Sequence, residues 1–196
     1  MSPFLKDAQG KPLTVYRGEC VNADIHEPKG YLRCLYFGNV ETANNYALPN
    51  KTGCEYHGPR VFPAHLVLKR PFMNEPENPF LDLQLVINRL GRSEAERIAI
   101  RFAKWIEETD QWDRINKERR YKGVEDYLRS PMGDVSQLYF QAFVFFQSFM
   151  EVGRLTRLGY DGAIHGGSGW GSAQKPEYCV FSRKQVFLTI SQSFLE

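Results

Sequence analysis

The chain begins and ends with segments that have the pattern of β-strands, and a long stretch with helical patterns separates the two groups. The expected strands are rich in β-branched and aromatic residues, and they cover residues 13–17, 32–37, 61–68, 161–165, 177–182 and 185–190. Strands that are grouped in this way do not form the alternating strand–helix units of a parallel sheet. The order of the segments therefore predicts an α+β fold.

The stretch between the two groups, about residues 70–158, is expected to be a mainly helical insertion in one domain that spans residues 1–196. A chain of this length can build one good hydrophobic core. No internal repeat or low-complexity tract divides it further.

Within the insertion, residues 70–92 are expected to be mostly loop because Pro71, Pro76 and Pro79 interrupt them. Ser93 and Glu96 have the spacing of a capping box at the start of the next helix. More helix is expected around residues 110–129, where Pro131 would end it.

A further helix, buried on most sides, is expected from about Asp134 to Gly153 or Gly159. Its most apolar part, residues 135–150, is too short to cross a bilayer, since a spanning helix needs about 20 residues. No membrane partner is expected.

Before the insertion, Asn39 is expected to cap a short helix from Val40 to Ala47, which Pro49 would stop. Pro63 interrupts the third expected strand. Proline removes a backbone donor, so this strand is expected at a sheet edge or at a bulge.

Composition excludes several classes of protein. The formal net charge is +2, and the basic residues around 114–122 alternate with acidic ones, which is typical of a solvated helix face and not of a nucleic-acid-binding stripe. No G-x-G-x-x-G follows a strand and no Walker lysine is present, so a doubly wound nucleotide-binding fold is disfavoured.

The cysteines are Cys20, Cys34, Cys54 and Cys179. No two of them form a C-x-x-C pair, and only four histidines are present, so no metal site is expected. Cys34 and Cys179 lie in apolar runs and are expected to be core residues. No signal peptide opens the chain, and folding in a reducing cytoplasm is expected, with another route of secretion left open.

Three segments contain the candidate catalytic and binding residues. The first strand ends in Arg17-Gly18, and the second contains Tyr36-Phe37 and leads into a helix with Ala43 and Tyr46. The third segment is the run Glu177-Tyr178-Cys179-Val180-Phe181, in which a carboxylate opens an apolar strand after a glycine-rich loop.

These segments resemble, in chain order, the three catalytic motifs of ADP-ribosyltransferases. They are most similar to the branch that includes the PARP-like and diphtheria-toxin-like domains and relatives in phage polyvalent proteins and bacterial effectors. Arg17-Gly18 departs from that branch, which has His-Gly at this place, and instead resembles the arginine of the other branch. The resemblance implies a split antiparallel sheet with an NAD cleft.

The resemblance also implies roles for individual residues. Glu177 is the expected catalytic carboxylate beside the ribose of NAD, where it would stabilise an oxocarbenium-like transition state. Tyr36 and Tyr46 are expected to hold the cationic nicotinamide ring between aromatic faces. Arg17 would contact ribose or phosphate oxygens through its planar fork of donors, and Gly18 would allow a close backbone approach to the nicotinamide amide.

The loop at residues 165–172 is expected to contact the acceptor, because the resemblance places the acceptor-binding loop immediately before Glu177. Trp170 and Lys175 are the candidate acceptor-binding residues. Lys175 stands where arginine-modifying members of the family have Gln or Glu, which counts against arginine as the acceptor. His165 and His57 are not expected to be catalytic, because an isolated histidine seldom has a catalytic role.

The sequence leaves three functions open. The favoured one is mono-ADP-ribosyl transfer from NAD to a macromolecule, with protein as the expected acceptor and nucleic acid not excluded. An NAD glycohydrolase would use the same residues with water as the acceptor. A catalytically inactive fold that binds a protein partner is the non-enzymatic alternative.

Overall fold

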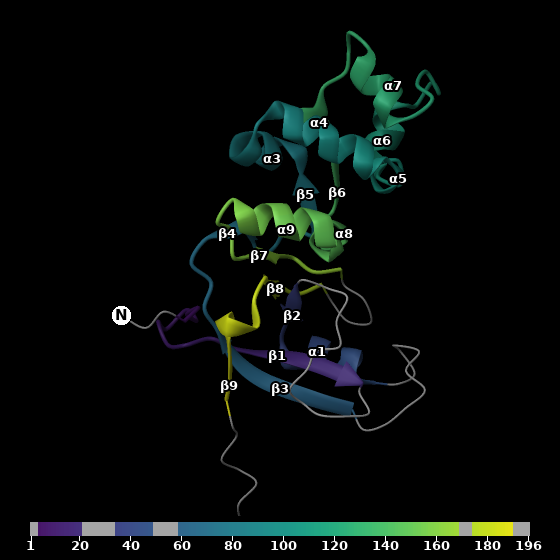
Figure 1. Cartoon of the computed structure of the whole chain (residues 1–196). Helices are drawn as coiled ribbons and strands as arrows, with labels where there is room; N and C mark the ends of the chain where they lie inside the picture. The colour runs from purple at the N-terminus through teal and green to yellow at the C-terminus, as the bar shows by residue number, and fades with distance from the viewer. Residues whose placement is uncertain (1–3, 21–33, 49–58, 169–173, 190–196) are drawn as a thin grey trace, which may run out of the picture. The chain divides into compact units, whose positions relative to one another are not determined.

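The computed structural model describes residues 4–20, 34–48, 59–168 and 174–189. The chain forms two compact units, the first from Met1–Asn78 together with Phe145–Glu196 and the second from Pro79–Val144 (Figure 1). The chain thus leaves the first unit and returns to it, and the second unit begins and ends inside the range expected for the insertion. The α+β class that the order of segments predicts is confirmed.

The first unit contains a three-stranded antiparallel sheet with the order β1-β3-β9. Its strands are Thr14–Cys20 (β1), Pro59–Leu66 (β3) and Val186–Leu188 (β9). The expectation that Pro63 marks an edge strand or a bulge is wrong, because β3 is the middle strand. Pro63 is tolerated there because the ladder with β9 covers only Ala64–Leu66, and beyond it Pro63 takes part only through its carbonyl oxygen, which accepts a hydrogen bond of 2.9 Å from the N–H of Thr189.

A second sheet of the same unit has the order β2-β8-β7-β4. Its strands are Leu35–Phe37 (β2), Glu177–Val180 (β8), Gly162–His165 (β7) and Pro71–Glu75 (β4). Only β4 and β7 run parallel, and the other neighbours are antiparallel. A pair of hydrogen bonds between Tyr16 and Gly38 connects the edge of the first sheet to the end of β2.

A hydrophobic core lies between these two sheets. It comprises the buried side chains of Val15, Phe37, Ala64, Leu66 and Val180. Side chains alternate along a strand, so the residues next to Phe37 and Val180 in sequence must point to the opposite face of their sheet. That opposite face carries Tyr36 and Cys179, which are directly paired.

The helix after β2, Val40–Ala47 (α1), has the predicted bounds, and the predicted N-cap is confirmed: the side chain of Asn39 accepts a hydrogen bond of 2.8 Å from the backbone N–H of Thr42. The helix packs closely on β1 at Gly18. A Cβ atom at Gly18 would overlap the carbonyl oxygen of Ala43. The absence of a side chain at Gly18 therefore serves the contact between β1 and α1.

Two short helices near the end of the chain are Ala142–Gln147 (α8) and Phe149–Arg157 (α9). Phe72 of β4 contacts Phe145, Phe146 and Tyr160, with ring centroids 5.1–6.4 Å apart. Phe146 also stacks on His165 at the end of β7. This aromatic cluster covers part of the second sheet.

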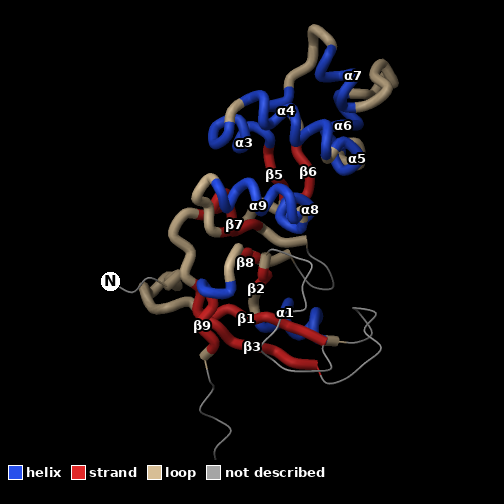
Figure 2. The backbone as a smooth tube through the Cα atoms, in the orientation of Figure 1, coloured by secondary structure: helices blue, strands red, loops and turns tan. Residues whose placement is uncertain are grey.

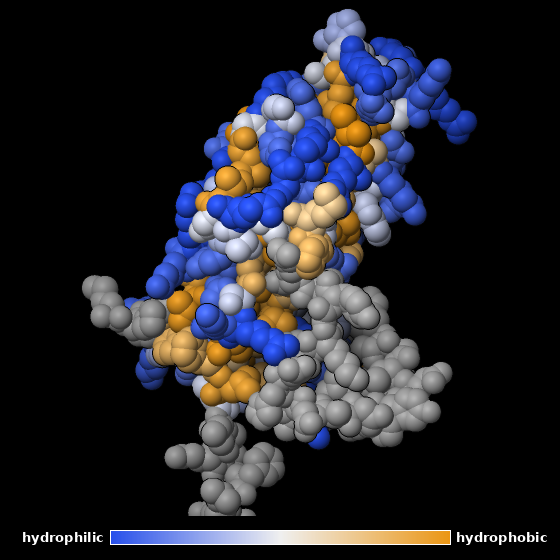
Figure 3. Space-filling view, viewed as in Figure 1, coloured by the Kyte–Doolittle hydropathy of each residue, from blue (hydrophilic) through white to orange (hydrophobic). Residues whose placement is uncertain are grey.

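The second unit is mainly helical (Figure 2). Its helices are Leu83–Leu90 (α3), Arg92–Arg101 (α4), Ala103–Ile106 (α5), Asp110–Ile115 (α6), Val124–Arg129 (α7) and a 3-10 turn at Val135–Gln137 (η1). Two short antiparallel strands, Phe80–Asp82 (β5) and Tyr139–Gln141 (β6), bring its two ends together. On the face shown in Figure 3, hydrophilic side chains cover much of this unit, with apolar ones between them.

Three local expectations for the insertion are wrong. Residues 70–92 are not mostly loop, because Pro71 starts β4 and Pro79 immediately precedes β5, two positions where a missing N–H is tolerated. Ser93 does not cap α4: the N-cap is Gly91, and Glu96 pairs instead with Arg92.

The third wrong expectation is the single helix that was expected to begin at about Asp134. It is divided into η1, β6, α8 and α9, because residues Tyr139–Gln141 pair with β5. The helix expected around residues 110–129 is confirmed and consists of two helices, α6 and α7. No helix among the described residues is long and apolar enough to span a membrane.

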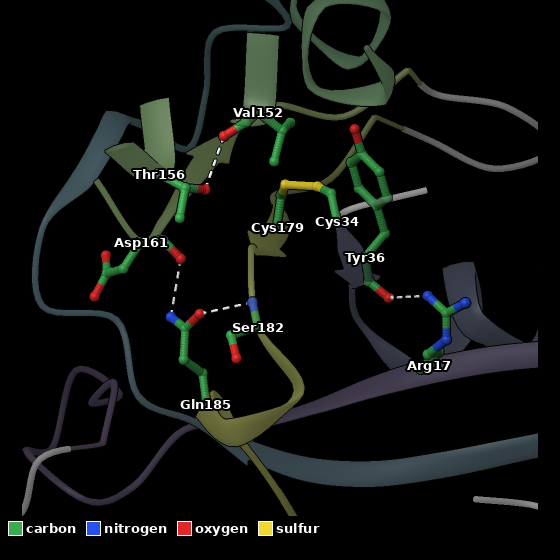
Figure 4. Close-up of a disulfide and its surroundings, with 9 residues drawn as sticks. All are labelled: Arg17, Cys34, Tyr36, Val152, Thr156, Asp161, Cys179, Ser182 and Gln185. Carbon is green, nitrogen blue, oxygen red and sulfur yellow. Dashed lines mark hydrogen bonds between the residues drawn. A yellow bond between two sulfur atoms is a disulfide. The ribbon is translucent and has the colours of Figure 1, made fainter. Parts of the chain in front are cut away.

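The expectation that Cys34 and Cys179 are core residues is confirmed, but the sequence did not predict the bond between them. Cys34 and Cys179 are buried, as core residues would be, but they form a disulfide, with their Cα atoms 5.9 Å apart (Figure 4). Their proximity follows from the pairing of β2 with β8, which no sequence spacing reveals. Disulfides persist mainly in oxidising compartments, so this bond argues against the reducing cytoplasm that the sequence led us to expect.

Replacement of both cysteines by alanine should lower the free energy of unfolding by about 3–5 kcal/mol, because the bond closes a very long loop in the unfolded chain. Chemical denaturation of the oxidised wild type and the double variant measures this difference. Wild type in strong reductant should match the double variant. Equal stability of all three proteins would show that the bond does not form in solution.

Gly18→Ala should destabilise the protein by about 1–3 kcal/mol, because β1 and α1 must separate to admit the methyl group. Gly10→Ala provides a control, since nothing lies within 4 Å of a Cβ atom there, although its φ of 78° adds backbone strain. Thermal unfolding compares the two variants. A smaller loss for Gly18→Ala than for Gly10→Ala would contradict the close packing.

Candidate functional site

Tyr36, Tyr46 and Glu177 come together from three different elements. Tyr36 on β2 is opposite Cys179 on β8, and Glu177 is two residues before Cys179, so both side chains are on the same face of the sheet. Tyr46 comes from α1. Burial raises the pKa of both tyrosines, the charge of Glu177 raises it further, and Tyr46 adds to the rise at Tyr36, so the three polar groups lie in one cluster.

The carboxyl group of Glu177 lies in a nearly dry position, since only 7% of the residue is exposed. Burial raises the pKa of Glu177 to about 7, and a hydrogen bond with the backbone of Ser168 opposes this rise. The group is therefore close to half-ionised at neutral pH. A carboxyl with such a pKa can respond to a bound cation by losing its proton.

The loop after β7 fits tightly around Glu177. A Cβ atom at Gly167 would lie 3.1 Å from Cγ and 3.2 Å from Cδ of Glu177, and the φ of Gly167 is +70°, which favours glycine. The next residue, Ser168, forms a side-chain hydrogen bond with Tyr46. The segment Gly167–Ser168 thus holds the carboxyl group and one tyrosine in place.

Tyr36 presents a half-buried ring beside Glu177. Burial, the charge of Glu177 and then that of Tyr46 raise the pKa of Tyr36 well above its usual value, so its hydroxyl remains protonated. Its ring meets the ring of His165 edge to face, with the centroids 6.1 Å apart. Tyr36 therefore offers an aromatic surface and a neutral hydroxyl within one cluster.

Arg17 lies near this cluster, but it contacts the backbone of Tyr36 and not its ring (Figure 4). Its Nη1 donates a hydrogen bond of 3.1 Å to the carbonyl oxygen of Tyr36, and its Nε forms an ion pair with Glu19. Two donor groups of the guanidinium are thus engaged within the protein. In this arrangement Arg17 connects β1 to β2 and fixes the position of Tyr36.

Gly18 is well placed for a backbone contact. The N–H and C=O of Tyr16 bond to Gly38, so they point away from β3, and those of Gly18 point the same way because the residues are two apart. The backbone of Gly18 therefore faces the side on which β2 lies. Its Cβ direction is taken by α1, as described above.

Of the two expected acceptor-binding residues, Lys175 lies within the described residues. Lys175 is exposed, and its carbonyl oxygen would lie 2.5 Å from a Cβ atom at Gly167, so its backbone adjoins the loop that holds Glu177. Trp170 lies outside the described residues. Among the described residues, no group of three or more His, Cys, Asp or Glu could hold a metal ion.

His165, which the sequence did not mark as a candidate site residue, lies beside Glu177. It is fully buried and directly opposite Glu177 in the pairing of β7 with β8. A polar residue that ends an apolar strand, just before the loop that leads to Glu177, was the available signal. A single sequence could not show which strand pairs with the strand of Glu177.

Comparison with protein-family models, with curated proteins and with solved structures finds no match to this chain. The cluster of Glu177, Tyr36, Tyr46 and His165 must therefore be interpreted from its own geometry and from the motif resemblance.

The raised pKa of Glu177 makes a prediction about stability. In the unfolded chain the group ionises near 4.5, and in the folded protein near 7. The folded state holds its proton more tightly, so stability is highest below pH 4.5 with respect to this group and falls as pH rises to about 7.

Glu177→Gln removes this titration. We expect it to stabilise the protein by up to about 3 kcal/mol above pH 7, and progressively less toward pH 4.5. Thermal unfolding of both proteins from pH 5 to pH 9 measures the difference. A difference that is independent of pH would mean that the pKa of Glu177 is not raised.

Proposed function

We propose that this protein cleaves NAD and transfers ADP-ribose to a macromolecular acceptor, with release of nicotinamide. The observation that carries the proposal is the meeting of Tyr36, Tyr46 and Glu177 in one cluster. They come from three segments that follow the order of the ADP-ribosyltransferase motifs. A buried carboxyl next to aromatic rings is the environment that a cationic nicotinamide ring and its ribose require.

The reaction breaks the bond between ribose C1′ and the nicotinamide nitrogen, and the bonding electron pair leaves with nicotinamide. C1′ then carries partial positive charge. Ionised Glu177 would stabilise that charge most strongly in the transition state, which is the condition for catalysis. A nucleophilic oxygen or nitrogen of the acceptor bonds to C1′ and loses its proton.

The tyrosines would act before the bond breaks. Tyr36 remains protonated next to Glu177, so its ring can lie against a cation without adding a second negative charge. Tyr46 is held by Ser168, and this hydrogen bond couples α1 to the loop beside Glu177. Arg17 would serve mainly to position Tyr36, because it contacts the carbonyl oxygen of that residue.

The acceptor is expected to approach by way of the loop before Glu177. Lys175 is exposed next to this loop and would contact a protein acceptor there. The same cluster can also pass ADP-ribose to water, so hydrolysis of NAD is the competing outcome of the test below.

Glu177→Gln should reduce the rate of nicotinamide release from NAD by about a hundredfold or more, the scale of losing a positioned electrostatic group. Glu41→Gln is the matched control, since Glu41 is an exposed carboxylate on the helix that carries Tyr46. Chromatography of released nicotinamide gives both rates. Equal rates for the two variants would remove Glu177 from the mechanism.

Wild type that releases no nicotinamide would leave the inactive binding module as the function. For an active protein, NAD labelled in the adenosine part and a cell lysate separate transfer from hydrolysis. Label that appears in macromolecules with wild type and not with Glu177→Gln supports transfer. Label that appears only in free ADP-ribose identifies a glycohydrolase.

A further inference from the structure

His165 has a buried environment that fixes its ring. The residue is not exposed at all, and its ring is parallel to that of Phe146, with an interplanar angle of 4° and centroids 5.8 Å apart. The ring of Tyr36 meets it in a T-shaped arrangement, with an interplanar angle of 71°. These contacts leave the imidazole little freedom to rotate.

The proton on this ring can be assigned from its hydrogen bonds. Nδ1 accepts a hydrogen bond of 3.1 Å from the backbone N–H of Gly167. Burial lowers the pKa of His165 to about 4, so the ring is neutral near pH 7 and carries its one proton on Nε2. Among the described residues, Nε2 is buried and has no hydrogen-bond partner.

A buried donor without an acceptor carries a free-energy penalty that packing alone does not repay. This donor lies close to a buried acceptor, because His165 and Glu177 are directly paired on neighbouring strands and share one face. Cβ atoms in such pairs are about 4.5–5.5 Å apart. A group between His165 and Glu177 could accept a hydrogen bond from Nε2–H and donate one to the carboxylate. A hydroxyl group does both.

We propose that His165 is a ligand-binding residue whose Nε2–H donates a hydrogen bond to the oxygen of a ribose hydroxyl, while the same hydroxyl donates a hydrogen bond to the ionised carboxylate of Glu177. This inference rests on the proposed function, in which the ribose next to the nicotinamide lies beside Glu177. The two residues together would recognise one hydroxyl, and a sugar that lacks it would leave Nε2–H of His165 without an acceptor and Glu177 with one hydrogen bond fewer.

Two substitutions separate the roles of the two ring nitrogens. In His165→Asn, the side-chain oxygen can replace Nδ1 as the acceptor for Gly167, and nothing replaces Nε2–H. In His165→Gln, the longer side chain can place an amide N–H where Nε2–H was. Binding is measured by calorimetry with a non-cleavable NAD analogue that has a carbocyclic nicotinamide ribose, and with its 2′-deoxy and 3′-deoxy forms.

For wild type, removal of one of the two hydroxyl groups should weaken binding about tenfold or more, since buried polar groups are left unpaired. His165→Asn should bind the parent analogue about tenfold more weakly, and its deoxy penalty should be smaller than that of wild type, because only Glu177 then contacts the hydroxyl. His165→Gln should retain most of both effects. Should the Asn variant not fold, His165→Phe, which keeps the ring against Phe146, replaces it.

Unchanged affinity of His165→Asn, or weaker binding with the full deoxy penalty retained, would overturn the role of His165. In that case wild type still binds the analogue and cleaves NAD, so the proposed function stands. Wild type that neither binds the analogue at millimolar concentration nor cleaves NAD would overturn both proposals together.

Discussion

The antiparallel pairing of β2 with β8 is the contact on which the rest of the first unit depends. It brings Phe37 and Val180 into the core on one face, and Tyr36 and Cys179 together on the other. One ladder therefore supplies both a packed face and the face that carries the candidate site. Because a slip of one residue would exchange the two faces, the buried core fixes the register that also positions Glu177 beside Tyr36.

The same ladder explains why the disulfide lies where it does. Cys34 immediately precedes β2, two residues before Tyr36, and Glu177 and Cys179 are two residues apart on β8. The covalent bond therefore lies on the same face as the candidate site. It restrains the two strands that carry the carboxyl and the ring. A site built on restrained strands keeps its geometry better than one built on loops.

The local signals around Asn39 predicted local structure well, whereas the capping-box spacing of Ser93 and Glu96 did not. Asn39 and the following residues gave α1 with its correct bounds, because capping and helix propensity act between near neighbours. The second unit was harder, since β6 exists only through its pairing with β5, and an aromatic run such as Tyr139–Gln141 fits a buried helix equally well.

The residues of the candidate site also differ in whether the sequence reveals them. Glu177, Tyr36 and Tyr46 could be named because motif spacing is visible in one chain. The disulfide and His165 could not, because both follow from which strands are neighbours: Cys34 meets Cys179 across β2 and β8, and His165 meets Glu177 across β7 and β8. Strand order is a property of the whole fold, and spacing along the chain does not encode it.

The second unit has its first and last residues side by side. Phe80 pairs with Gln141, and the N–H of Ala142 donates a hydrogen bond of 2.8 Å to the carbonyl oxygen of Pro79. The chain thus enters and leaves the helical unit at nearly the same point in space. A unit that is attached in this way can be enlarged, shortened or exchanged without altering the span that the first unit must bridge.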